Sequence, residues 1–524
     1  MKKIKISALI PMALMATLSL MSCSVAKQET TTAPVVDKAT TSKTSDKPNI
    51  LFIFADDQSP KTLGAYGNQH IKTPNLDKLA QNGVNFNNAY NMGAWNGAVC
   101  QASRAMLNSG RSVWQAHKMD RQFAQGKGVE TTWAKLLEKE GYDTYMAGKW
   151  HVAASAEKVF QNAKHVRPGM PDDAYDHASQ QKIYDDFMAG KTDYKSPGDF
   201  LPVGYNRPLS KNDDSWSPTD PKFTGFWKGG KHWSEVLKDD TLGFIEQAKA
   251  SDNPFFMYVA FNAPHDPRQA PQAYQDMYDE ESLPLPSNWA DNYPERDFIG
   301  NSARLRDAAL APFPRTEYAT RVHLKEYYAL ISHLDTQVGE ILAVLKASGK
   351  MDNTYIIYTA DHGLAVGERG LFGKQNMYEE SVRAPFIIWG PGIEGGQTVD
   401  ADIYLQDVMA TSLEIAGAEK PDYVFFNSII DLAKGKTTNS HYDAIYGAYI
   451  DSQRMIKKDG FKLLVYPLAN TIKLFDLAAD PDEVTNLANQ AKYKSKVRNL
   501  FAELIKLQAD LEDEMDLTAM YQAL

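Results

Sequence analysis

The stretch Asn49-Ile-Leu-Phe-Ile-Phe-Ala55 is an unbroken apolar run that ends abruptly on Asp56 and Asp57. A strand that is apolar at every position is buried on both faces, as in the middle of a parallel sheet covered by helices. The pattern therefore predicts a central strand whose carboxyl end carries two carboxylates.

Three further segments repeat this pattern of an apolar strand followed by polar side chains. Strands are predicted over 143–147, 254–261 and 354–360, and helical patterns over 132–140 and 327–348 lie among them. This alternation predicts an α/β fold with a large, mostly parallel sheet flanked by helices on both faces. Ligands bind at the carboxyl ends of the strands in such folds, so we expect the four strand ends to converge on one site.

The pattern changes after Pro421. Residues 443–449, 452–456 and 461–466 alternate in polarity and are joined by short turns, which is typical of a small antiparallel sheet. A final helix is predicted over 488–511. We therefore expect a catalytic domain over 48–421 and a smaller α+β subdomain over 422–524.

Composition narrows the class of protein. The chain has 524 residues, of which 43% are hydrophobic and 23% charged, which excludes a small disulfide scaffold and a broadly disordered protein. The net charge of −10 argues against a broad cationic surface for nucleic acid. An anionic substrate is compatible with it, because a few local cations decide such binding.

The N-terminus predicts export. Lys2, Lys3 and Lys5 precede a broken apolar stretch over 6–21, which has the layout of a secretory signal and is too short for a comfortable membrane span. It closes on Leu20-Met21-Ser22-Cys23, which resembles a bacterial lipobox whose cysteine is acylated. The alternative is an ordinary cleaved signal with an incidental cysteine. We expect a lipoprotein signal over 1–23, a flexible tether over 24–47 and an envelope lipoprotein anchored to the membrane.

Carboxylates at two strand ends suggest a metal site. Asp56, Asp57 and Asp361 offer hard oxygen ligands that suit Ca²⁺ or Mg²⁺, and His362 could add a nitrogen. An isolated Asp-Asp pair is more often a helix cap or a turn. The second acidic strand end favours the metal interpretation.

Positive and titratable side chains accompany these carboxylates. Arg104, Lys149 and Lys374 add fixed charge, and His151 and His265 could transfer protons near neutral pH. Each of them alone would be read as an ordinary solvated residue. Together they predict a site that holds a tetrahedral oxyanion, either phosphate or sulfate.

The segment Val99-Cys100-Gln101-Ala102-Ser103-Arg104, followed by Ser109-Gly110-Arg111, resembles the signature of the type I sulfatases, a family of the alkaline-phosphatase-like superfamily. Other family motifs follow in order, at Gly148-Lys149-Trp150-His151, Pro264-His265, Asp361-His362-Gly363, Gly373-Lys374 and 475–487.

The resemblance implies that Cys100 is oxidised to Cα-formylglycine, whose hydrate attacks the sulfur of a sulfate ester to give a covalent sulfo-enzyme. One Ca²⁺ would be held by Asp56, Asp57, matured Cys100, Asp361 and His362. The remaining roles implied are as follows: Asp361 assists loss of the attacking proton, Lys149 and Lys374 hold the sulfate oxygens, His265 protonates the leaving alkoxide, His151 takes the second hydroxyl proton, and Arg104 holds the diol.

One residue departs from the family pattern. Ala102 stands two residues after Cys100, where the aerobic maturation enzyme favours Pro. The Ala form resembles substrates of the anaerobic, radical SAM maturase, which we therefore expect as a partner.

The substrate lies outside these motifs. An aromatic-rich excursion over 160–238 could stack on sugar rings or merely cover the edge of the sheet; it contains Tyr175, Tyr184, Tyr194, Tyr205, Trp216, Trp227 and Trp233. An exported enzyme of this kind suits a sulfated polysaccharide or its oligosaccharides, for example an algal galactan such as carrageenan. The alternatives are a phosphodiesterase or phosphonate monoester hydrolase on the same fold, a non-catalytic glycan-binding surface lipoprotein, and a redox role for Cys100, which no second thiol would support.

Overall fold

The computed structural model describes residues 47–168, 182, 185–186, 189–192, 204–221, 227–228 and 230–524. Residues Thr44–Leu524 form one compact unit. The predicted signal and the predicted tether up to residue 46 lie outside the described residues, whereas Lys47, the last residue of that tether, pairs with Glu140 at 2.9 Å. Within the described parts, no helix combines the length and apolarity needed to cross a membrane.

A large mixed sheet forms the centre of the molecule. Five neighbouring strands run parallel, and β12 lies antiparallel to both β9 and β2 at one side. The strand order is β13 (Gln397–Val399), β2 (Val84–Tyr90), β12 (Arg383–Trp389), β9 (Thr354–Ala360), β1 (Asn49–Ala55), β8 (Phe255–Ala260), β4 (Asp143–Lys149) and β5 (Asn162–Arg167), with β14 (Ile403–Tyr404) also paired to β2. The predicted fold class is confirmed.

The central strand β1 is buried at every residue, as its apolar run predicts. It pairs in parallel with β8 on one side, where Ile50 lies opposite Phe256, and with β9 on the other, where Ile50 lies opposite Tyr355. Because the strands are parallel and nearly in register, their carboxyl ends reach the same edge of the sheet.

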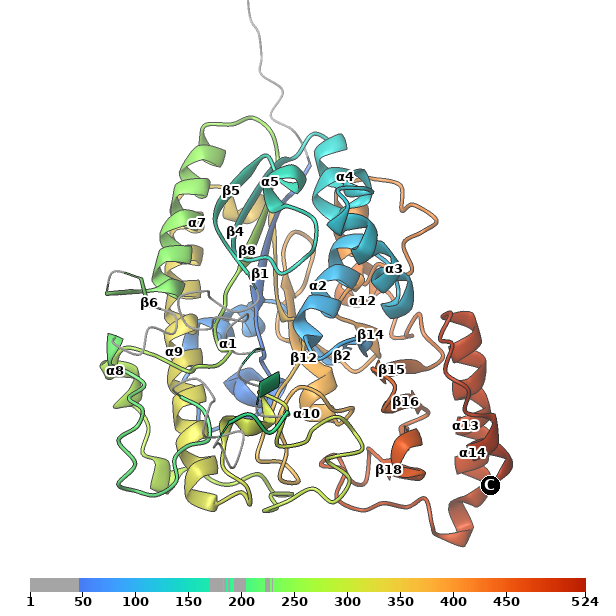
Figure 1. The fold of residues 1–524 in the computed structure, drawn as a ribbon. Helices are drawn as coiled ribbons and strands as arrows, with labels where there is room; N and C mark the ends of the chain where they lie inside the picture. The colour runs from blue at the N-terminus through green and yellow to red at the C-terminus, as the bar shows by residue number, and fades with distance from the viewer. Residues whose placement is uncertain are drawn as a thin grey trace, which may run out of the picture. The chain divides into compact units, whose positions relative to one another are not determined.

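Helices cover both faces of this sheet, as Figure 1 shows. On one side lie α1 (Pro74–Asn82), α7 (Trp233–Lys249) and α9 (Glu317–Ala347); on the other lie α2 (Val99–Ser109), α3 (Val113–Ala124), α4 (Trp133–Lys139), α11 (Asp407–Ile415) and α12 (Ile430–Ala433). The shorter helices are α5 (Ala156–Val159), α8 (Gln272–Gln275), α10 (Glu379–Val382) and α14 (Thr518–Gln522). Two short hairpins pair β6 (Trp227–Lys228) with β7 (Lys231–His232) and β10 (Ala365–Val366) with β11 (Phe372–Gly373).

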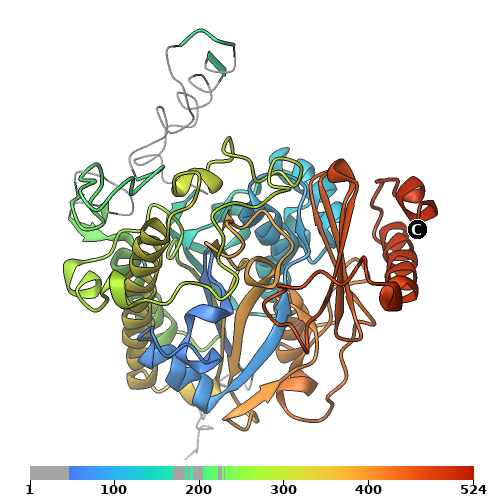
Figure 2. The same cartoon turned by 90° about the horizontal axis from the view of Figure 1, so that it is seen from below.

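A second sheet has the order β18 (Thr471–Asp476), β17 (Phe461–Tyr466), β16 (Gln453–Lys458), β15 (Ile445–Tyr449) and β3 (Gly93–Ala94). The first four strands are antiparallel, as predicted. Helix α13 (Lys494–Asp510) packs on β16 and β17, outside the sheet as seen in Figure 2. Val424, Ile429, Ile430, Leu432 and Ala433 pack instead with the core of the large sheet, whereas Phe425 and Phe426 pack with the core of the second sheet.

The edge strand β3 comes from a distant part of the chain, just before Cys100, and pairs in parallel with β15. Gly93 has φ of +89°, and a Cβ there would lie 1.8 Å from the carbonyl oxygen of Ala448. Only glycine therefore allows this approach of the two backbones. The pairing ties the segment that leads into α2 to the second sheet.

Candidate active site

The carboxyl ends of β1, β4, β8 and β9 meet at one buried pocket. Asp56 N donates to Ala263 O at 3.1 Å, and Asp361 N donates to Ala55 O at 3.3 Å, so the chains stay together past the strands. Asp57 N then donates to the Asp361 carboxylate at 3.1 Å. The three carboxylates are at most 1% exposed.

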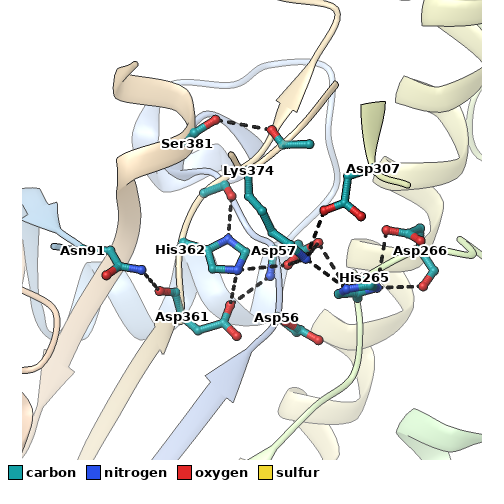
Figure 3. A network of polar contacts seen from close by, with 12 residues as sticks. Asp56, Asp57, Asn91, His265, Asp266, Asp307, Asp361, His362, Lys374 and Ser381 are labelled. Atoms are coloured by element: carbon teal, nitrogen blue, oxygen red, sulfur yellow. Dashed lines mark hydrogen bonds and ion pairs between the residues drawn. The ribbon is translucent and has the colours of Figure 1, made fainter. Parts of the chain in front are cut away.

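His362 faces these carboxylates with one ring nitrogen. Its Nδ1 lies 2.8 Å from Gly363 O, and because a carbonyl oxygen only accepts, Nδ1 must be the protonated nitrogen. Nε2 then faces Asp57 Oδ1 at 3.2 Å and Asp361 Oδ1 at 3.5 Å (Figure 3). Burial opposes a charged imidazole, yet Asp361 and Asp57 raise the pKa of His362 to about 9.

The donor set fits a divalent cation. Asp56 Oδ1 and His362 Nε2 are fully buried and form no hydrogen bond within the described part of the chain. Ligand atoms of Asp56, Cys100, Asp361 and His362 lie within 4.8 Å of one another, as do those of Asp56, Asp57, Cys100 and His265. Burial and repulsion from Asp361 raise the pKa of Asp56, so its ionised form is disfavoured. A cation shared by the two carboxylates would offset this repulsion. Clustered carboxylate oxygens select hard ions such as Ca²⁺.

Helix α2 presents Cys100 and Arg104 to this pocket. Cys100 lies in the first turn and Arg104 one turn later, on the same face of the helix. Arg104 Nε donates to Asp361 Oδ2 at 3.0 Å, and its Nη1 donates to Lys149 O at 2.7 Å. This buried guanidinium therefore joins the helix to the ends of β4 and β9.

Two lysines reach the carboxylates from different elements. Lys149, the last residue of β4, donates to Asp56 Oδ2, and Lys374, just after β11, donates to both oxygens of Asp57 at 2.9 and 2.8 Å. Burial of the Cys100 thiol opposes its ionisation, but Lys149 and Lys374 lower its pKa well below the usual value. The pocket thus stabilises negative charge at the position of Cys100.

Two histidines complete the predicted set. His265 Nδ1 donates to Asp266 O at 2.7 Å, which leaves Nε2 facing Lys374 Nζ at 3.0 Å. His151 has a left-handed backbone with φ of +53°, is half-buried and contributes to lowering the pKa of the Cys100 thiol. The structure therefore brings together every site residue that the sequence predicted.

Sequence reasoning missed a second layer of polar residues around Lys374 and His265. Asp307 Oδ2 lies 3.6 Å from Lys374 Nζ and accepts from Gln375 Nε2 at 2.7 Å. Arg306 Nη2 lies 3.4 Å from His265 Nε2. Both residues lie in an irregular loop that does not directly follow a strand. The sequence therefore offers no signal for them beyond an adjacent Arg and Asp, which is a common pair. Asn91, whose side chain donates to Asp361 O at 2.9 Å, carried no signal either.

The aromatic excursion is only partly described. Tyr175, Tyr184 and Tyr194 lie outside the described residues, as does the side chain of Trp227. Tyr205 and Trp216 are 7% and 8% exposed, so they pack inside the protein instead of offering open faces to a sugar. Tyr205 instead donates a hydrogen bond to Asp266, the residue that follows His265. For these two residues the packing interpretation holds.

A mixed α/β sheet whose strand ends gather carboxylates, cations and a nucleophile defines a hydrolase of the alkaline-phosphatase-like superfamily. The family model described as Sulfatase matches residues 48–418, and the model for the C-terminal part of N-sulphoglucosamine sulphohydrolase matches 367–510. The chain belongs to the sulfatase family, as its motifs predicted, and is a sulfuric ester hydrolase.

Individual relatives agree with this membership. An arylsulfatase of Clostridium perfringens is 31% identical over 482 residues, which cover 88% of this chain and 94% of that protein. An ulvan-active sulfatase of Formosa agariphila is 28% identical, covering 97% and 89%. Among solved structures, BT4656 in complex with its substrate D-glucosamine-2-N,6-O-disulfate matches with a TM-score of 0.66 and 22% identity, covering 89% of this chain and 99% of that one, which shows the shared fold.

Proposed function

We propose that this protein hydrolyses sulfate esters on a sulfated saccharide, with a nucleophile formed from Cys100 and a bound Ca²⁺. The observation that carries the proposal is the buried convergence of Cys100, three carboxylates and two lysines in one pocket. A saccharide substrate is supported by the ulvan-active relative and by the match to a sulphoglucosamine sulphohydrolase model. Within this class an algal galactan such as carrageenan is a narrower candidate.

Asp56, Asp57, Asp361 and His362 would hold the cation, together with the matured side chain of residue 100. When bound, Ca²⁺ supplies positive charge that polarises a sulfate oxygen and favours an ionised nucleophile. The two buried atoms that form no hydrogen bond, Asp56 Oδ1 and His362 Nε2, support this ligand set. Asp361 also accepts from Arg104, which fixes the direction of its carboxylate.

Conversion of Cys100 to formylglycine supplies a hydrated aldehyde, whose two hydroxyls offer an attacking oxygen and a later route for expelling sulfate. Ala102 in the motif favours the anaerobic type of maturase as the partner that makes it. Arg104, whose side chain is buried beneath Cys100, would orient the matured residue.

The surrounding side chains would hold charge and move protons. Lys149 Nζ and Lys374 Nζ would bind the sulfate oxygens and neutralise the charge that builds on them. His265 Nε2 would donate a proton to the departing sugar oxygen. Asp57 lies 3.7 Å from this nitrogen and, against the effect of burial, raises the pKa of His265, which favours the protonated form that a proton donor needs. His151, in contact with the Cys100 side chain, would accept the hydroxyl proton during sulfate release.

The proposal is tested by inorganic sulfate release from defined carrageenan, ulvan, fucan and glycosaminoglycan oligosaccharides, with an aryl sulfate and a phosphate diester for comparison. We expect sulfate from at least one glycan and higher kcat/KM on sulfate than on phosphate esters. The mass of the Cys100 peptide should match formylglycine, which is lighter than cysteine. A fully active enzyme with an unmodified thiol contradicts the proposed nucleophile, and faster phosphate-diester hydrolysis favours the phosphodiesterase alternative.

We also propose that the chain is exported and anchored through acylated Cys23, and that it divides near residue 421 into a catalytic part and an α+β part. The support for anchoring is the leader over 1–23 with its lipobox-like end. Detergent-phase partitioning of the wild type, lost in Cys23→Ser, tests the anchor; equal partitioning of both contradicts it.

A further inference from the structure

A cavity of about 620 Å³ lies between α3 and two segments of the C-terminal region, residues 450–454 and 512–515. Trp95, the residue after β3, lines it. None of its lining residues belongs to the site described above.

Helix α3 lines this cavity and also contacts two segments that carry site residues. Asp120 on α3 accepts from Gln101 Nε2 at 3.0 Å and from Ala153 N at 3.4 Å. Gln101 directly follows Cys100, and Ala153 lies two residues after His151. The cavity-lining residues His117 and Arg121 flank Asp120 on the same helix. The cavity therefore lies beside the segments that follow Cys100 and His151.

The loop that carries Trp95 also borders both spaces. Gly97 O accepts from Gln375 Nε2 at 3.0 Å, beside Lys374, and Ala94 O accepts from Ile450 N at 2.9 Å, at the cavity wall. Trp95 thus stands on a short segment that reaches from the lysine of the pocket to the lining of the cavity.

The lining of the cavity contains two tryptophan rings and a histidine. Trp95 stacks on the imidazole of His117, with ring centroids 5.0 Å apart and an angle of 8°. Burial and the neighbouring Arg121 lower the pKa of His117, so this pair is uncharged at neutral pH. Trp114 lies near by, with Arg454 5.1 Å above its ring and its Nε1 donating to Tyr446.

The charged side chains of the lining favour an uncharged ligand. Glu512 pairs with Lys118 at 2.6 Å, and Asp513 pairs with Arg454 at 2.6 Å. The lining also contains two further carboxylates, Asp451 and Glu514, and one further cation, Arg121. An additional sulfate group would meet more negative than positive charge here, whereas sugar hydroxyls can donate to carboxylates and accept from guanidinium groups.

We propose that this space, the Trp95 cavity, is a subsite for an uncharged pyranose unit next to the sulfated unit in the catalytic pocket. Half-buried aromatic rings with polar groups around them suit the apolar face and hydroxyl rim of such a ring. The inference rests on the proposed function, and it makes the substrate an oligosaccharide or polysaccharide instead of a single sulfated sugar.

The test compares kcat/KM for sulfate release from a sulfated monosaccharide and from an oligosaccharide that carries the same sulfated unit beside an unsulfated one. We expect the wild type to prefer the oligosaccharide at least about tenfold, and Trp95→Ala to lose that preference mainly through a higher KM. Trp95→Phe should retain most of it. Phe298→Ala removes an aromatic ring that is 51% exposed and outside the cavity lining, and should keep the preference.

Several results would overturn the subsite. They are equal kcat/KM of the wild type on both substrates, an unchanged preference in Trp95→Ala, and an equal loss on both substrates in that variant. Collapse of the preference at about 0.5 M salt would indicate a charged ligand and also contradict it. Failure of the proposed function looks different: the wild type would release sulfate from an aryl sulfate but neither bind nor desulfate any glycan.

Discussion

Two buried ionic clusters of the molecule each combine carboxylates with basic side chains. One is the active site, where Asp57 faces Lys374 and Asp361 faces Arg104. The other joins the large sheet to the second one, where Lys462 Nζ lies 3.0 Å from both the Glu379 and the Glu483 carboxylates.

The clusters differ in the side chains beside their charges, not in how completely their polar atoms are satisfied. In the second cluster Glu379 lies 3.0 Å from Arg383 Nε and accepts from the Tyr90 hydroxyl at 3.1 Å, and Glu483 accepts from Glu379 N at 2.7 Å. Buried atoms that form no hydrogen bond within the described residues occur in both clusters: Asp56 Oδ1 and His362 Nε2 in the active site, and Arg383 Nε and Glu483 Oε1 in the second cluster. Of the two, the active site alone places Cys100 among its carboxylates. Neither buried charge nor an unsatisfied atom therefore distinguishes a functional site from a structural one, whereas a nucleophile beside the carboxylates does.

The largest effect is expected from Cys100→Ala. Removing the nucleophile should lower kcat/KM by at least about 10³-fold, because no other described side chain can take its place. Thermal unfolding should change little, since a small side chain replaces a small one. Sulfate release and differential scanning calorimetry measure both. Activity within tenfold of the wild type would contradict the assignment.

Asp57→Asn should come next. It removes one charge from the proposed cation site and the partner of Lys374, so activity should fall at least about 10²-fold and bound calcium should decrease. Elemental analysis of the purified protein gives the metal content. Glu379→Gln, a matched change in the other cluster, should keep its calcium. Equal calcium in Asp57→Asn and the wild type would remove Asp57 from the ligand set.

Lys462→Met tests the second cluster. Loss of this cation leaves two carboxylates facing each other in the interior, and the free energy of unfolding should fall by about 3–5 kcal/mol. Urea denaturation measures it. The triple variant with Glu379→Gln and Glu483→Gln should recover most of the loss, because no unpaired charge then remains. A single variant as stable as the wild type would show that the cluster is not ionised.

The smallest effect is a pH dependence of stability. Burial opposes ionisation of Glu379, but Lys462 and Arg383 hold its pKa well below the ordinary value of 4.5. A depressed pKa in the folded state stabilises the protein above pH 4.5, and that contribution is lost as the pH falls below it. The difference in unfolding free energy between wild type and Glu379→Gln should therefore shrink between about pH 6 and pH 3. A constant difference would contradict the ionised pair.

The elements that sequence alone could predict are those with a strong local pattern. The runs at 49–55 and 354–360 match β1 and β9 residue for residue, because burial on both faces leaves no charged residue in them. Strands β2 and β12 were not predicted. Asn85, Asn87 and Asn88 interrupt the apolar pattern of β2, which becomes a strand by pairing with β12, β13 and β14. Helix α9 begins ten residues earlier than its predicted start at Tyr327.

The site shows the same division. Residues that directly follow strands or lie in the Cys100 motif could be found, because parallel strands bring their ends together. Arg306 and Asp307 could not be found, since they lie in a loop whose position depends on contacts with other segments of the chain. Arg315 donates to Ala308 O at 2.7 Å and to Gly370 O at 3.0 Å, and these contacts between distant segments leave no local pattern.

The pairing of β3 with β15 limits how this enzyme can be shortened. A protein trimmed at the end of the large-sheet region would leave the backbone of Gly93 and Ala94 without its neighbour, only a few residues ahead of the nucleophile. The C-terminal region thus helps to hold in place the segment that leads to Cys100. Replacing the C-terminal region by that of a relative is therefore expected to change the position of Cys100 as well as the surface that the region itself contributes.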